Sequence, residues 1–174
     1  MTYKNGAKTY VLMAVLYGVP MGLFFGIVTL NVIAGIITGV VCGVLFSVLM
    51  LAFSKGMEKK YDKMRAELSA ERRIVCDGAA TIMGNGGWIF LSEYGLEFYP
   101  HKVNFSRKEI MLPINQIKDI QVKANRLTVS VPGDTVTVTV VNAPAWKKHI
   151  SDEIAAYNAR LQASYENGYD PYTL

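Results

Sequence analysis

The chain has 174 residues, 51% of them apolar, with 18 Lys and Arg against 14 Asp and Glu. The net charge of +4 lies before residue 74, because residues 74–174 carry nine basic and ten acidic side chains. A near-neutral folded part argues against a nucleic-acid-binding protein, which should be basic. The two cysteines, Cys42 and Cys76, have no metal or redox spacing and exclude a disulfide framework.

An uncharged and mostly apolar run of 46 residues lies between Lys8 and Lys55. About 20 residues cross a bilayer as a helix, so the run is too long for one span and fits two. We expect spans over residues 10–30 and 32–53, joined by a tight turn at Asn31, the most polar residue of the run. The run also exceeds the apolar part of a signal peptide, which predicts an uncleaved hairpin.

Glycines recur at every fourth position in both predicted spans. Glycine costs about 1 kcal/mol relative to alanine inside a water-exposed helix. In lipid, small residues instead allow close contact between helix backbones. With a turn at residues 30–31, the two glycine rows lie at matching depths, which favours packing within one hairpin over packing between copies. The expected packing residues are Gly18, Gly22, Gly26, Gly35, Gly39 and Gly43.

Basic residues flank the hairpin on both sides, and none lies in the central turn. Lys4 and Lys8 precede it, and five Lys and Arg residues follow within residues 55–65. By the positive-inside rule, residues 1–53 form a transmembrane hairpin with both termini in the cytoplasm, in a membrane we expect to be the plasma membrane. Few polar groups occur in the spans, which argues against a pore.

Residues 54–73 form a charged segment with seven basic and four acidic side chains. Met57, Tyr61, Met64 and Leu68 recur at helical spacing, which predicts an amphipathic linker helix that continues the second span. We favour a solvated stalk, with an apolar face open to pairing with another copy, over a helix lying on anionic lipid. The acidic residues weaken the attraction of such a helix to lipid.

From residue 74 the pattern changes to short β-branched and aromatic runs separated by turn residues, GNGG at 84–87 among them. Thr and Val alternate strictly in residues 135–140, so their hydroxyl and methyl groups lie on opposite faces. Seven such runs predict about seven antiparallel strands with one wet face.

A helix is predicted after the last strand, with Asn142 as its N-cap and Pro144 in its first turn. Its apolar stripe includes Trp146, which we expect to plug the open end of a small β-barrel or sandwich. Residues 74–162 are therefore an α+β domain, a barrel capped by a C-terminal helix. Residues 163–174 are expected to be disordered.

Several features of the strand region occur together in a known family. They are an aromatic strand at Trp88–Leu91, the run Leu96–Phe98, a loop at residues 101–105, the pattern of residues 110–117, and the helix with Trp146 and Ile150. Residues 74–154 thereby resemble the GRAM domains of bacterial proteins, members of the pleckstrin-homology-like superfamily. The resemblance implies a PH-like fold that binds membrane lipid head groups or protein segments, and it does not imply an enzyme.

The sequence departs from the phosphoinositide-binding relatives in its first hairpin, where basic residues are usual and residues 83–87 have none. A basic cluster follows the run LEFYP instead. Its candidate lipid- or partner-binding residues are His101, Lys102, Asn104, Arg107 and Lys108. Such groups hold a phosphate by charge-assisted hydrogen bonds. The alternative is that they are ordinary loop residues.

No catalytic or cofactor pattern is found in the sequence. Neither His101 nor His149 has a metal-ligand neighbour at the usual spacing, and His149 is expected on the surface. No phosphate-binding loop occurs. The carboxylates at 77, 93, 97 and 109 are not paired as acid and base. We therefore predict that the protein is not an enzyme and holds no cofactor or metal.

These inferences predict a membrane-anchored cytosolic GRAM/PH-like module that recognises a lipid head group or recruits a protein partner at the inner membrane face. Nucleic acid is not an expected partner. The alternative is a self-assembling homo-oligomeric scaffold, packed through its glycine-rich hairpins, with no small-molecule ligand.

Overall fold

The computed structural model describes residues 1–3, 6–102, 104 and 108–166. The chain divides into two compact units. One is Asn5–Met64, and the other combines Met1–Lys4 with Arg65–Leu174. The helical unit is thus an insertion between the first residues and the rest of the second unit.

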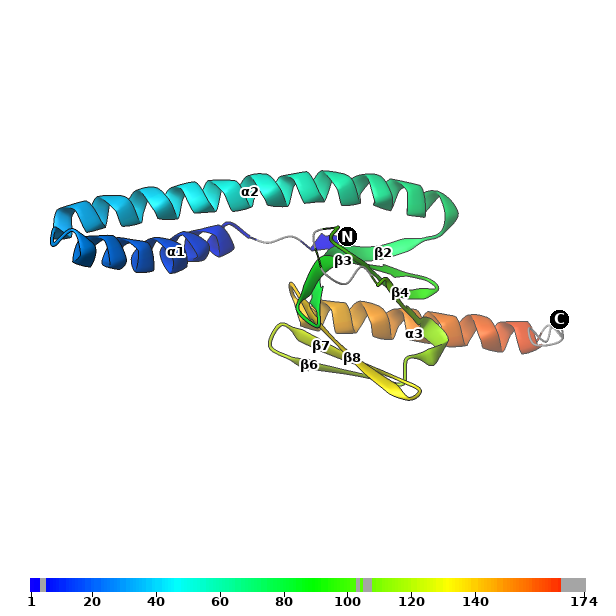
Figure 1. Ribbon diagram of the computed structural model, residues 1–174. Coiled ribbons are helices and arrows are strands. Elements are labelled where there is room, and N and C mark those ends of the chain that lie inside the picture. Colours follow the sequence, from blue (N-terminus) through cyan, green and yellow to red (C-terminus); the bar gives the residue numbers. More distant parts are fainter. Residues whose placement is uncertain (4–5, 103, 105–107, 167–174) are drawn as a thin grey trace. The chain divides into compact units, whose positions relative to one another are not determined.

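The helical unit is a pair of antiparallel helices, α1 (Ala7–Val28) and the longer α2 (Val32–Glu71), which runs on into the second unit (Figure 1). The turn between them lies where the sequence predicts it. Leu30 adopts a left-handed φ of 52°. The Asn31 side-chain oxygen accepts a hydrogen bond from the Ala34 N–H at 3.1 Å, which caps the start of α2.

The two helices approach each other through their glycines. A Cβ on Gly22 would lie 2.8 Å from the carbonyl oxygen of Gly35, and a Cβ on Gly39 would lie 2.8 Å from that of Gly18. Beyond the glycines, the rings of Tyr17 and Phe46 stack with centroids 4.5 Å apart. Any larger side chain in these rows would push the backbones apart.

The large apolar side chains of both helices face away from this contact. In the most apolar 18-residue window of each helix only 11% is buried, and the mean hydropathy is 2.2 in α1 and 2.6 in α2. Both helices are therefore long and apolar enough to cross a bilayer, and their apolar surface is exposed.

The second unit is an antiparallel sheet of the PH-like type, with strand order β5-β4-β3-β2-β8-β7-β6. These strands correspond to the seven predicted ones. An additional strand, β1, pairs in parallel with β2 and was not predicted, because two residues carry no periodicity. The strands are β1 (Thr2–Tyr3), β2 (Ile74–Ile82), β3 (Asn85–Ser92), β4 (Gly95–Pro100), β5 (Ile110–Pro113), β6 (Asp119–Lys123), β7 (Arg126–Val131) and β8 (Asp134–Val140); a 3-10 turn, η1 (Ile114–Gln116), follows β5.

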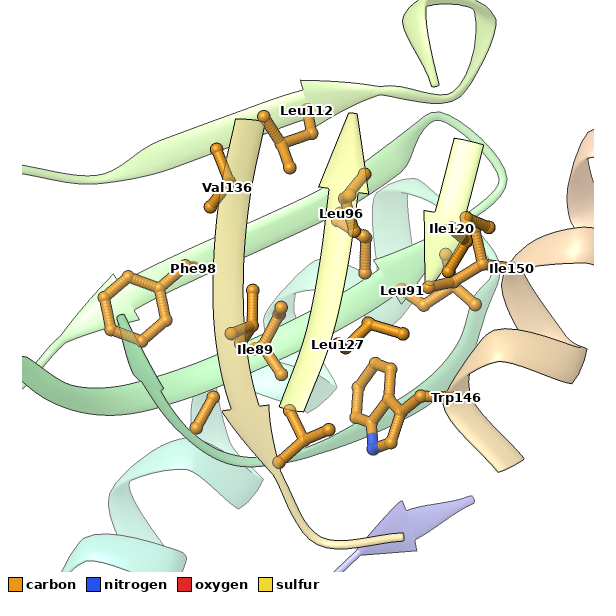
Figure 2. Packing of buried hydrophobic residues seen from close by; sticks show 14 of the residues in the cluster. Ile89, Leu91, Leu96, Phe98, Leu112, Ile120, Leu127, Val136, Trp146 and Ile150 are labelled. Carbon is orange, nitrogen blue, oxygen red and sulfur yellow. The ribbon is translucent and has the colours of Figure 1, made fainter. Parts of the chain in front are cut away.

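The helix α3 (Ala143–Glu166) packs on β6, β7 and η1. Trp146 is fully buried, and Figure 2 shows its ring beside Leu127 in the core of the sheet. The plug predicted from the sequence is therefore present. The helix continues four residues beyond the predicted limit of 162, because residues 163–166 contain no glycine or proline.

The prediction of one wet face holds for β8 and is wrong for β3. Val136, Val138 and Val140 are buried while the threonines between them are exposed. In β3, by contrast, Trp88 and Phe90 are buried as well as their inward-facing neighbours. On this outer face Asp77 pairs with Arg65 near the end of α2, and Glu97 pairs with Arg72 directly after it, so the chain from Arg65 onward is not a solvated stalk.

Candidate binding surface

Three arginines each form an ion pair with a buried carboxylate of the domain: Arg65 near the end of α2, and Arg72 and Arg73 directly after it. The carboxylates come from β2, β4 and α3 and are at most 7% exposed. The pairs are Arg65–Asp77 at 3.2 Å, Arg72–Glu97 at 2.6 Å and Arg73–Glu153 at 2.6 Å. A buried carboxylate is tolerated only when it is paired and hydrogen-bonded. The arginines therefore attach the end of α2 to the sheet and to α3.

The carboxylates of the outer face are saturated by further donors. Trp88 Nε1 donates to Asp77 at 3.0 Å, and the Tyr99 hydroxyl donates to Glu97 at 2.8 Å. Burial, together with this bond to Glu97, raises the pKa of Tyr99 to about 12. Carboxylates bound in this way by neighbouring donors contribute to holding the fold together.

The ion pairs of Asp77 and Glu97 with arginines could not be anticipated from the sequence. Their partners lie 12 and 25 residues earlier in the chain, at positions that no short motif connects. One signal was available: the run Trp88–Leu91 has no polar alternation, which is typical of a strand that is covered on both faces.

The turn between β2 and β3 forms one end of the sheet. Its two central residues, Met83 and Gly84, have φ values of 49° and 79°, so the turn lies earlier than the predicted GNGG. Such a pair of positive φ angles matches the twist of the flanking strands. Met83 is 82% exposed, which places an apolar side chain at the tip of this turn.

The chain after β4 is held against the same end of the sheet. The His101 N–H donates to the Gly86 carbonyl at 3.0 Å, and the Asn104 amide donates to the same oxygen at 2.5 Å. A Cβ on Gly86 would lie 3.2 Å from the His101 ring. The structure therefore brings His101 and Asn104 together, and gives the Asn104 amide a role in positioning the loop.

The other candidates of the basic cluster divide into two groups. Lys102 and Lys108 are exposed, while Arg107 lies outside the described residues. We call the surface made by Met83, His101, Lys102 and Lys108 the loop end. Among the described residues, no group of three or more His, Cys, Asp or Glu could hold a metal ion.

The sequence matches a family model described as the GRAM domain over residues 51–153. Solved structures with a similar fold include the FERM and C-terminal domain complex of Drosophila Merlin, at 12% identity and a TM-score of 0.43, covering 49% of this chain. The chain spans only 30% of that Merlin chain.

Two further structures cover about half of the sequence. One is the C-terminal domain of an unknown protein from Leishmania infantum, at 19% identity and a TM-score of 0.42, covering 56% of this chain and 97% of that one. The other is the N-terminal PH domain of human ARAP2, at 17% identity and a TM-score of 0.38, covering 48% of this chain and 79% of that one. No curated protein matches the sequence.

Proposed function

Because the chain belongs to the GRAM domain family, whose members bind lipids or proteins, we propose that it is a binding module held at a membrane by its own helical hairpin. The ligand we propose is an anionic lipid head group, bound at the loop end. The observation that carries the proposal is the insertion into the folded domain of a hairpin whose residues 9–54 carry no charge and whose large apolar side chains face outward.

The hairpin supports the membrane part of the proposal. A water-soluble helix buries its apolar stripe, whereas α1 and α2 expose theirs and contact each other through glycines. Residues on both sides of the hairpin belong to one compact unit, since β1 pairs with β2. Both ends of the hairpin then lie on the same side of the membrane, and the flanking Lys and Arg residues favour the cytoplasmic side.

The loop end supports the lipid part. Two exposed ammonium groups, Lys102 and Lys108, and the exposed Met83 suit a surface that is both anionic and apolar. The domain as a whole is near neutral, so its own attraction to lipid is weak. A membrane anchor compensates for weak affinity because it keeps the domain at a high effective concentration near its ligand.

The proposal is tested with the full chain in micelles of an uncharged detergent, using dioctanoyl phosphatidylglycerol as the anionic lipid and dioctanoyl phosphatidylcholine as the neutral one. We expect saturable binding of the first lipid only. Replacing both lysines, Lys102→Gln with Lys108→Gln, should weaken binding about thirtyfold, since each basic group contributes about 1 kcal/mol.

The matched control is Lys118→Gln with Lys123→Gln, which removes the same charge from exposed positions around β6. Equal loss in both double variants would mean that net charge alone attracts the lipid. Absence of binding in the unmodified chain would leave a protein partner as the ligand. We do not propose the self-assembling scaffold, because the glycine rows contact each other within one hairpin.

A further inference from the structure

A slot for an extended segment lies at the edge of β2. Strand β8 pairs only with Ala80–Ile82, and the earlier residues of β2 would be unpaired on that side without β1. The first residues of the chain fill this position. The Met1 nitrogen donates to the Val75 carbonyl at 2.9 Å, and the Asp77 N–H donates to the Met1 carbonyl at 2.9 Å. These bonds are those that a strand makes when it is added to a sheet.

Each side chain of β1 has its own partners in the slot. The Thr2 hydroxyl donates to Asp77 at 2.9 Å and accepts from Arg65 at 2.6 Å. Tyr3 is only 7% exposed, and its ring centroid lies 5.7 Å from that of Trp146. The slot therefore recognises a hydroxyl residue followed by an aromatic one.

The Tyr3 hydroxyl also reaches α3. It lies 3.1 Å from Nε2 of His149. The sequence analysis expected His149 on the surface, and the structure instead makes it half-buried, with the phenol as a partner. The Tyr3 hydroxyl therefore has a hydrogen-bond partner inside the slot.

Two further features are consistent with a site that accommodates the backbone of an extended segment. A Cβ on Gly78 would lie 2.7 Å from the Tyr3 carbonyl oxygen, so only glycine leaves room for the segment. Trp146 is fully buried, and among the described residues its Nε1 has no hydrogen-bond acceptor. A buried donor without an acceptor costs free energy, so β1 does not use every bonding group that the slot offers.

We propose that this slot is a docking site for an extended peptide and that residues 1–3 occupy it as an intramolecular ligand. Apart from Tyr3, every buried member of the core cluster comes from the part of the chain from β2 to α3, and β1 lies off the main path of the sheet. Docking joins the segment before α1 to the unit that also contains the end of α2. In this way β1 ties both ends of the hairpin to the same unit. The proposal is independent of the lipid site.

The test uses the full chain in uncharged detergent micelles, with Cys42→Ser so that Cys76 is the remaining thiol. Cys76 is fully buried in the same core cluster as Tyr3. We expect Thr2→Ala with Tyr3→Ala to raise the rate of Cys76 modification by maleimide about tenfold or more. The synthetic peptide Met-Thr-Tyr-Lys-Asn-Gly should restore protection saturably, and Met-Thr-Ala-Lys-Asn-Gly should not.

A second variant keeps the test decisive if the double variant unfolds. Gly78→Ala leaves residues 1–3 unchanged and should raise the rate of Cys76 modification in the same way. When it is added to the double variant, Gly78→Ala should abolish protection by the peptide. Unchanged modification in Gly78→Ala, or absence of protection by the first peptide in a folded double variant, would overturn the proposal. Protection of the double variant by added unmodified chain would assign the segment to a neighbouring copy and overturn the intramolecular assignment.

Discussion

In the hairpin, glycines lie between the helices and the large apolar side chains face outward, whereas in the GRAM domain the large apolar side chains face inward. The two regions also differ in their charged side chains. Residues 9–54 carry no charged side chain, while the domain buries three carboxylates and pairs each with an arginine.

The difference shows which force holds each region together. Burial of apolar surface from water stabilises the domain. In the membrane location that we propose for the hairpin, this force is small between helices, so close contact between backbones replaces it. Substitutions should therefore follow opposite rules: loss of volume damages the domain, and gain of volume damages the hairpin.

The largest effect is expected from loss of volume at Trp146. Trp146→Ala should lower the free energy of unfolding of the domain by about 3–5 kcal/mol, because the indole fills the end of the core. Denaturant unfolding followed by near-ultraviolet circular dichroism measures this change. The control Tyr94→Ala removes an aromatic ring that is 61% exposed and should cost less than about 0.5 kcal/mol. Similar losses in both variants would contradict a core role for Trp146.

The next effect concerns the ion pairs that join α2 to the domain. Arg72→Met should cost about 3 kcal/mol, because it leaves the buried Glu97 without its cation. The double variant Arg72→Met with Glu97→Gln should regain part of this loss. Lys148→Met, which breaks the exposed pair with Asp152, should cost less than about 1 kcal/mol. An equal cost for Arg72→Met and Lys148→Met would show that the buried pairs do not fasten α2.

The periodicity of apolar residues, and the residues that end helices and strands, explain what could be predicted from the sequence. The turn at Asn31, the seven strands and the buried Trp146 all follow from patterns within a few residues. The uninterrupted charge-free run predicts two helices that could span a membrane, and the structure contains both.

Contacts between distant segments could not be predicted in this way. Strand β1 pairs with residues more than 70 positions later, and Arg72 and Arg73 bind carboxylates on separate elements. His101 and Asn104 lie three positions apart in the sequence, and both donate to the Gly86 carbonyl. Their hydrogen bonds to Gly86 depend on the pairing of β3 with β4, which sequence spacing does not reveal.

The hairpin tests the opposite rule, in which added side-chain volume is destabilising. Gly22→Leu should destabilise the pairing of α1 with α2 by about 1–3 kcal/mol, because even a Cβ would lie 2.8 Å from the Gly35 carbonyl oxygen. Disulfide formation between Tyr17→Cys and Phe46→Cys, with Cys42→Ser and Cys76→Ala, reports the contact in membranes. Leu23→Ile, on an outward-facing residue that is 63% exposed, should leave it unchanged. Undiminished crosslinking in Gly22→Leu would mean that the glycines are not needed for the contact.

The smallest effect is a pH dependence confined to the domain. Burial raises the pKa of Tyr99 to about 12 from the usual 10.0 of a tyrosine, so the folded state holds this proton more tightly than the unfolded state. Its contribution to stability is complete below about pH 10 and is lost as the pH rises through about 12. Tyr99 is partly exposed, which weakens the effect. Tyr99→Phe should therefore reduce the fall in unfolding free energy between pH 10 and 12, whereas Tyr94→Phe, at an exposed ring, should not. An identical fall in the unmodified chain and Tyr99→Phe would show that the proton of Tyr99 contributes nothing to the stability of the domain.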